Sequence, residues 1–104
     1  MARVLYRYTF GPEVPVEEAE ASLLLAILAA EGLHGEAEVR LDGAHYFDPG
    51  GRRCVIAADT RVGMDLNKLF VGFLRREFGE DAFQVERVDS AAGAGERRPA
   101  DVPA

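Results

Sequence analysis

The fold is read most directly from residues 36–58, EAEVRLDGAHYFDPGGRRCVIAA. Residues 36–47 alternate apolar and polar side chains, as a strand with one buried face does, and Gly43 is compatible with a bulge or bend. The sequence DPGGR at 48–52 is a strong turn signal, and residues 53–58 predict the return strand. A β-hairpin is therefore expected at the centre of the chain.

A strand and a helix are predicted on each side of this hairpin. They are a strand at 3–10, a helix from Pro15 to about Glu31, a helix at 61–78 and a strand at 83–88. Pro15 fits the first turn of a helix, and Gly32 suits the position after its last turn. Asp59 or Thr60 can cap the second helix, which Gly79 ends.

The resulting order, β-α-β-β-α-β, is that of the ferredoxin-like split βαβ plan. We expect a four-stranded antiparallel sheet with right-handed crossovers, both helices on one face and the other face bare. Residues 1–88 are predicted to form this single α+β domain. The remaining sequence, DSAAGAGERRPADVPA at 89–104, has no aromatic and only one branched aliphatic residue. It is therefore predicted to be a disordered tail.

The two predicted helices differ in their apolar residues when placed on a wheel at 100° per residue. The second helix has one stripe, formed by Val62, Leu66, Leu69, Phe70, Phe73 and Leu74. The first has two stripes, roughly opposed. We assign one to the core: Val16, Ala19, Leu23, Ala26, Ile27 and Ala30. The other is then expected to face outward: Ala21, Leu24, Leu25 and Leu28. Because both are apolar, the reverse assignment stays open.

A two-layer domain buries only one face of this helix, so the outward stripe is expected to contact a partner. The alternatives are a loop or tail folded over it, or a tilt that hides both edges. Residues 11–39 contain seven glutamates and no Lys or Arg, whereas residues 61–76 contain four bases and one acid. Repulsion between acidic faces would favour a basic partner surface, such as that of Lys68 and Arg75.

Few residues suit catalysis. The only candidate cluster, His45, Asp48 and Cys54, flanks the hairpin, but Cys54 on a central-looking strand is better explained as a small core residue. Two histidines and one cysteine fall short of the usual zinc-ligand set, and no phosphate-binding motif is present. We expect no cofactor and no metal.

The charge and the apolar content of the sequence argue against nucleic acids and membranes as partners. The 104 residues include 18 acids and 12 bases, a net charge of −6, which argues against nucleic-acid binding. Tyr6 and Tyr8 resemble base-stacking aromatics, but the third strand lacks the matching aromatics. The longest nearly apolar run, residues 21–30, is about half of what a bilayer requires. Arg7 interrupts the apolar stretch that a signal peptide would need, so a cytoplasmic location is expected. The sequence has 11 arginines and one lysine, which suggests a GC-rich bacterial genome.

These observations favour a small, non-catalytic interaction module. It is expected to associate with itself or with a larger protein through the first helix or the bare sheet face. A small-ligand-binding regulatory domain is the alternative, and an enzyme using His45, Asp48 and Cys54 is a weaker one.

Overall fold

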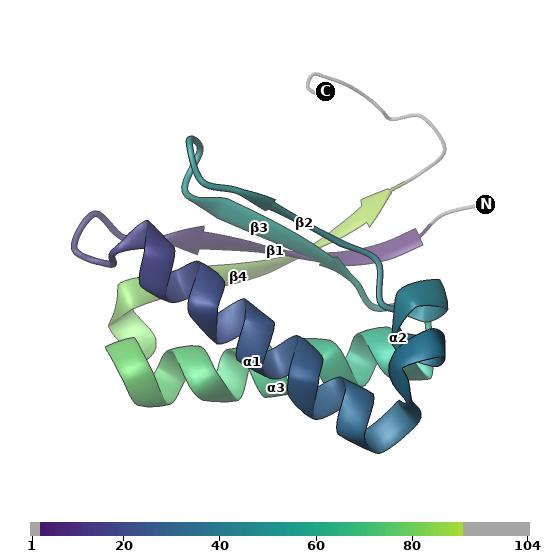
Figure 1. Cartoon of the computed structure of the whole chain (residues 1–104). Coiled ribbons are helices and arrows are strands. Elements are labelled where there is room, and N and C mark those ends of the chain that lie inside the picture. Colours follow the sequence, from purple (N-terminus) through teal and green to yellow (C-terminus); the bar gives the residue numbers. More distant parts are fainter. Residues whose placement is uncertain (1–2, 91–104) are drawn as a thin grey trace.

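A four-stranded antiparallel sheet and a layer of helices lie face to face in the computed structural model, which describes residues 3–90 (Figure 1). The strands are β1 (Arg3–Phe10), β2 (His45–Asp48), β3 (Arg53–Ala57) and β4 (Phe83–Ser90), in the order β2-β3-β1-β4. The helices are α1 (Val16–His34), α2 (Glu36–Asp42) and α3 (Arg61–Phe78), and a short 3-10 helix, η1 (Glu80–Ala82), precedes β4. The α+β class and the antiparallel sheet are confirmed. The extra helix means that the ferredoxin-like order is not cleanly matched.

The prediction of a strand over residues 36–47 is wrong in its first seven residues. They form α2, which Gly35 separates from α1 with a φ of +90°. An ion pair of 3.0 Å joins Glu36 to Arg40 one turn later, as a helix allows. Only Val39 of this helix is buried, so the alternation did not mark a buried strand face. The hairpin therefore has a first strand of only four residues, His45–Asp48.

Two further boundaries differ from the predictions. The first helix continues past Gly32 to His34, and Gly35 ends it. Strand β4 includes Asp89 and Ser90, which pair with Val4 and Arg3 of β1. The predicted tail therefore loses its first two residues to the sheet, and residues 91–104 lie outside the described part of the chain. The predicted helix at 61–78, with Thr60 as its cap and Gly79 after it, is confirmed.

The core lies between the inner face of the sheet and the helices. Tyr8 of β1 packs edge-on against Phe70 of α3, with ring centroids 4.8 Å apart. Helix α1 contributes small residues and one leucine to this core, whereas α3 contributes larger side chains. The buried residues of the two helices are Ala19, Ser22, Leu23, Ala26 and Ala30 from α1, and Val62, Gly63, Leu66, Asn67, Phe70 and Leu74 from α3.

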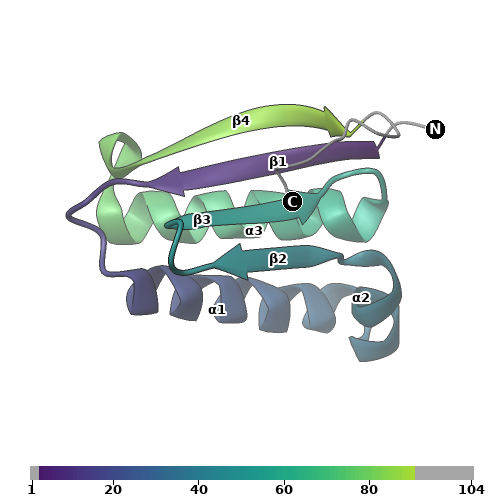
Figure 2. The same ribbon diagram turned by 90° about the horizontal axis from the view of Figure 1, so that it is seen from above.

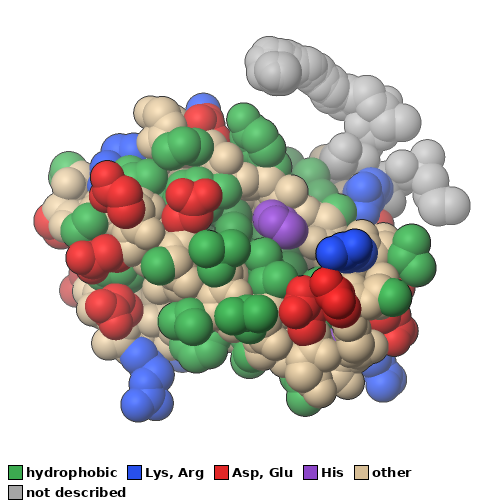
Figure 3. Space-filling view, in the orientation of Figure 1, with side chains coloured by type: hydrophobic (Ala, Val, Ile, Leu, Met, Phe, Trp, Pro, Cys, Tyr) green, Lys and Arg blue, Asp and Glu red, His purple; other side chains and the backbone are tan. Residues whose placement is uncertain are grey.

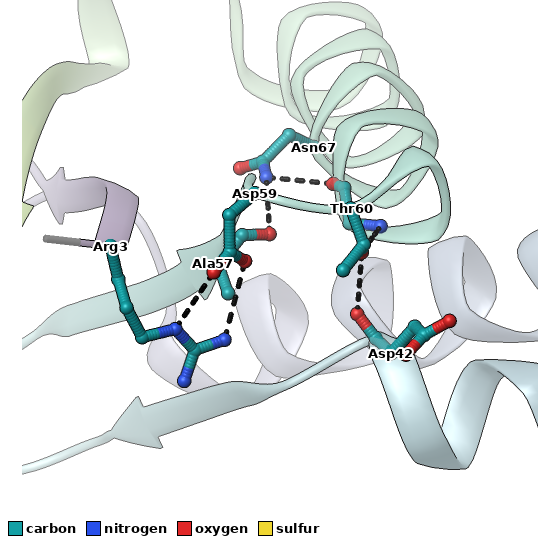
Figure 4. Close-up of polar contacts among 7 residues, drawn as sticks. Arg3, Asp42, Ala57, Asp59, Thr60 and Asn67 are labelled. Atoms are coloured by element: carbon teal, nitrogen blue, oxygen red, sulfur yellow. Dashed lines mark hydrogen bonds and ion pairs between the residues drawn. The ribbon is translucent and has the colours of Figure 1, made fainter. Parts of the chain in front are cut away.

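Polar contacts fix the start of α3 against the sheet and α2 (Figure 4). The Thr60 hydroxyl accepts a hydrogen bond of 2.9 Å from the backbone N–H of Gly63 and donates one of 2.8 Å to the carbonyl of Asp42. A Cβ atom on Gly63 would lie 2.3 Å from the carbonyl oxygen of Ala57. Only glycine therefore permits this close approach of helix and strand.

Candidate interaction surfaces

The outer side of α1 carries exposed leucines. Leu24, Leu25 and Leu28 are 57%, 55% and 62% exposed, and Ala21 beside them is also exposed. We call these four residues the leucine face. Hydrophobic side chains gather over α1 on this side of the molecule, with acidic side chains beside them (Figure 3). Of the two stripes predicted from the sequence, this one points away from the core.

Acidic side chains border the leucine face. On a helix wheel, Glu20 and Glu31 flank it on one side and Glu18 on the other, while Glu17 lies at its N-terminal end. Helix α1 contains no Lys or Arg. Its only basic side chain is His34, whose Nε2 lies 2.8 Å from the Asp65 carboxylate of α3. The leucine face is therefore an apolar patch bordered by negatively charged side chains.

A second apolar surface lies between α3 and β4, which we call the α3–β4 groove. Tyr8 and Val85 are cross-strand partners that point to the same side of the sheet. Tyr8 is 0% exposed, yet Val85 is 39% exposed, because α3 covers β1 and leaves the inner side of β4 open. Seen from above, α3 lies between α1 and the β4 edge (Figure 2). The groove has a volume of about 420 Å³ and is lined by Tyr6, Tyr8, Met64, Asn67, Lys68, Val71, Gly72, Arg75 and Val85.

The rim of this groove is positive. Lys68 makes no ion pair within 4.0 Å in residues 3–90, and Arg75 lies 3.7 Å from Glu80, which is a loose and exposed contact. The two cations alternate with Met64 and Val71 at the spacing of one helix face. Lys68 and Arg75, named from the sequence as a basic surface, therefore border one groove.

The open face of the sheet is more polar. Arg7 pairs with Glu86 at 3.0 Å across β1 and β4, and Arg53 lies 3.6 Å from Asp48 across β3 and β2. The side chain of Tyr46 is the most exposed aromatic on this face. Because these charges are paired across the strands, this face offers a partner less unpaired charge than the glutamates of α1 do.

The described contacts do not bring His45, Asp48 and Cys54 together. The Nδ1 atom of His45 lies 2.9 Å from the carbonyl oxygen of Gly43, and the carboxylate of Asp48 accepts a hydrogen bond from the Gly51 N–H and faces Arg53. Cys54 is fully buried in the core. Burial raises the pKa of its thiol to about 12, so the nucleophilic thiolate is not populated near neutral pH.

Sequence reasoning missed a contact made by Arg52. This residue ends the β2–β3 turn with a φ of +56°, and its guanidinium donates hydrogen bonds to the carbonyls of Gly11 and Val14. It therefore anchors the loop that leads from β1 into α1. No local pattern signals such a contact, because the partners are about 40 residues away in the chain.

Within residues 3–90, no three His, Cys, Asp or Glu side chains converge as a metal site would require. None of the helices in that range combines the length and the apolar character that a bilayer crossing demands.

A scan of family models and searches of curated proteins and of solved structures find no match to this chain. Its own residues and surfaces therefore carry the functional evidence.

Proposed function

We propose that this protein is a non-catalytic interaction module that associates with itself or with a larger protein through the leucine face of α1. The observation that carries the proposal is the exposure of Leu24, Leu25 and Leu28 on a helix whose opposite side supplies Ala19, Leu23, Ala26 and Ala30 to the core. Isolated exposed leucines are ordinary, but contiguous ones ringed by charge are typical of contact surfaces.

The energy available at this face is moderate. Burying the remaining exposed area of the three leucines is worth roughly 3–5 kcal/mol. Association costs about as much or more in lost translational and rotational freedom. The leucines therefore require further contacts from the charged border, and the glutamates around them make a cationic partner surface the favourable one.

We also propose that the scaffold is a split βαβ plan into which α2 is inserted. The strand order β2-β3-β1-β4 and the two long helices that link β1 to β2 and β3 to β4 support this assignment. Along the chain the insertion lies between α1 and β2, and it packs against both α1 and α3. A free, buried cysteine suits a reducing compartment, so we place the protein in the cytoplasm.

The test is sedimentation velocity of the wild type and of Leu24→Glu with Leu28→Glu across a concentration series. The double variant should stay folded by circular dichroism and lose association. Leu41→Glu is the matched control, since Leu41 on α2 is 82% exposed and lies outside the leucine face. A wild type that is monomeric at every concentration would remove self-association and leave only a different protein as partner. An unfolded double variant would assign the leucines to the core.

A further inference from the structure

We propose that the leucine face of one copy docks into the α3–β4 groove of a second copy, so that the chain assembles head to tail. This inference rests on the proposed function and names its partner. The two surfaces are the main unfilled apolar areas described above on the helix side of the sheet, and they carry opposite charge.

Both the leucine face and the α3–β4 groove present partly exposed apolar side chains that could pack against each other. The groove presents Val85 on its floor and Met64 and Val71 on its wall, all of them only partly covered. A helix lying along α3 in this groove would cover the inner side of β4, which α3 leaves open (Figure 2). Gly72 on the same wall has open space where a Cβ would stand, so nothing obstructs a close approach. The docked helix would complete the helical layer of the sheet.

The charges favour this pairing over face-to-face contact of two α1 helices. Two leucine faces in contact would bring together two sets of glutamates, with no Lys or Arg on either helix. In the groove, Glu20 and Glu31 at the border of the leucine face would meet Lys68 and Arg75. Opposite charges at an interface rim select the partner and speed association, whereas like charges oppose it.

The positions of the two surfaces determine the kind of assembly. Helix α1 packs on one side of α3, and the groove lies on the other, toward β4 (Figure 2). One pair of copies cannot fill both grooves at once, because each copy presents its two surfaces on opposite sides. Every open complex therefore retains one free leucine face and one free groove. Copies can therefore continue to add until the assembly closes into a ring. At low protein concentration the assembly stays short.

A mixing experiment tests this arrangement. The face variant is Leu24→Glu with Leu28→Glu, and the groove variant is Lys68→Glu with Arg75→Glu. Each variant alone should be monomeric in sedimentation velocity, with self-affinity reduced by at least about tenfold. An equimolar mixture should form a heterodimer and nothing larger, because only the groove of the first and the leucine face of the second remain intact.

The control variant is Arg61→Glu with Arg76→Glu, which makes the same charge change on α3 outside the groove. It should assemble as the wild type does. Leu24→Gln with Leu28→Gln serves as a milder face variant if the glutamates prevent folding.

Three outcomes would overturn the inference. If the groove variant assembles like the wild type while the face variant does not, two leucine faces pair with each other, and the proposed function survives without this partner. If both variants are monomeric but their mixture is too, the surfaces are not complementary. If the wild type never associates, both this inference and self-association in the proposed function fail.

Discussion

The phenol of Tyr8 donates a hydrogen bond of 2.5 Å to the side-chain oxygen of Asn67 inside the core. The amide nitrogen of Asn67 in turn donates to the carbonyls of Ala57 at 3.2 Å and Gly63 at 2.8 Å (Figure 4). One buried amide therefore links β1, the end of β3 and the first turn of α3. This link fixes the helix that forms one wall of the groove.

Tyr8→Phe should lower the free energy of unfolding by about 1–3 kcal/mol, because the buried oxygen of Asn67 would lose its donor. Urea unfolding followed by circular dichroism measures the change. Tyr46→Phe is the matched control, since the Tyr46 ring is exposed at the sheet edge, and it should have almost no effect. Equal effects of the two substitutions would contradict the role assigned to the Tyr8 hydroxyl.

Two glycines of α3 should respond to alanine in opposite directions. Gly63→Ala should destabilise the protein by more than about 2 kcal/mol, because the new Cβ would meet the carbonyl of Ala57 at 2.3 Å. Gly72→Ala should stabilise it by about 0.5–1 kcal/mol, since the Cβ would meet nothing within 4 Å and alanine favours the helix. Thermal unfolding of both variants checks the pair, and a Gly63→Ala protein as stable as the wild type would refute the close approach.

Stability should fall in alkaline solution. Burial raises the pKa of the Cys54 thiol to about 12 and also raises the pKa of the Tyr8 phenol. The folded state therefore holds these protons where the unfolded chain releases them. The protonated thiol and phenol therefore add to the free energy of unfolding in full below pH 9.0, the ordinary pKa of a cysteine thiol. This stabilisation is lost progressively as the pH rises above that value.

Cys54→Ala tests the thiol part of this effect. The variant should be less stable overall, because a core side chain is shortened, but its unfolding free energy should fall less steeply over about pH 9–11. Urea titrations at several pH values give both slopes. Parallel curves for variant and wild type would show that the thiol does not contribute.

Arg52→Ala should loosen the loop between β1 and α1, since its guanidinium bonds the carbonyls of Gly11 and Val14. We expect a loss of about 1–3 kcal/mol and faster amide hydrogen exchange at Val14. The neighbouring Arg53→Ala removes only an exposed contact to Asp48 and should change stability by less than about 1 kcal/mol. If the two arginine variants behaved alike, the anchoring role of Arg52 would be wrong.

Local patterns were sufficient for most of the fold. The one clean stripe of α3, its Thr60 cap and the turn at 48–52 each reflect one strong local preference. Residues 36–42 lacked such a preference, because a seven-residue segment with apolar residues at every second position fits a strand as well as a short helix. Leu41, 82% exposed, shows that its alternation did not report burial.

Of the two candidate surfaces, one could be predicted from the local sequence and the other could not. The leucine face could be found from one helix alone, since two opposed apolar stripes exceed what a two-layer domain buries. The groove could not, because it depends on β4 pairing with β1 at an edge that α3 does not cover. The sequence identified Lys68 and Arg75 as basic and outward, but only the strand order places them beside Val85.

The central claim is that the leucine face is a contact surface, and methyl-resolved NMR across a dilution series tests it most directly. The methyl signals of Leu24, Leu25 and Leu28 should shift together as concentration rises, and that of Met64 in the groove should shift with them. The signals of Leu41, which is more exposed to solvent than these leucines but lies outside both surfaces, should stay constant. Leucine-face signals that do not move up to millimolar concentration, or that move no more than those of Leu41, would contradict self-association through α1.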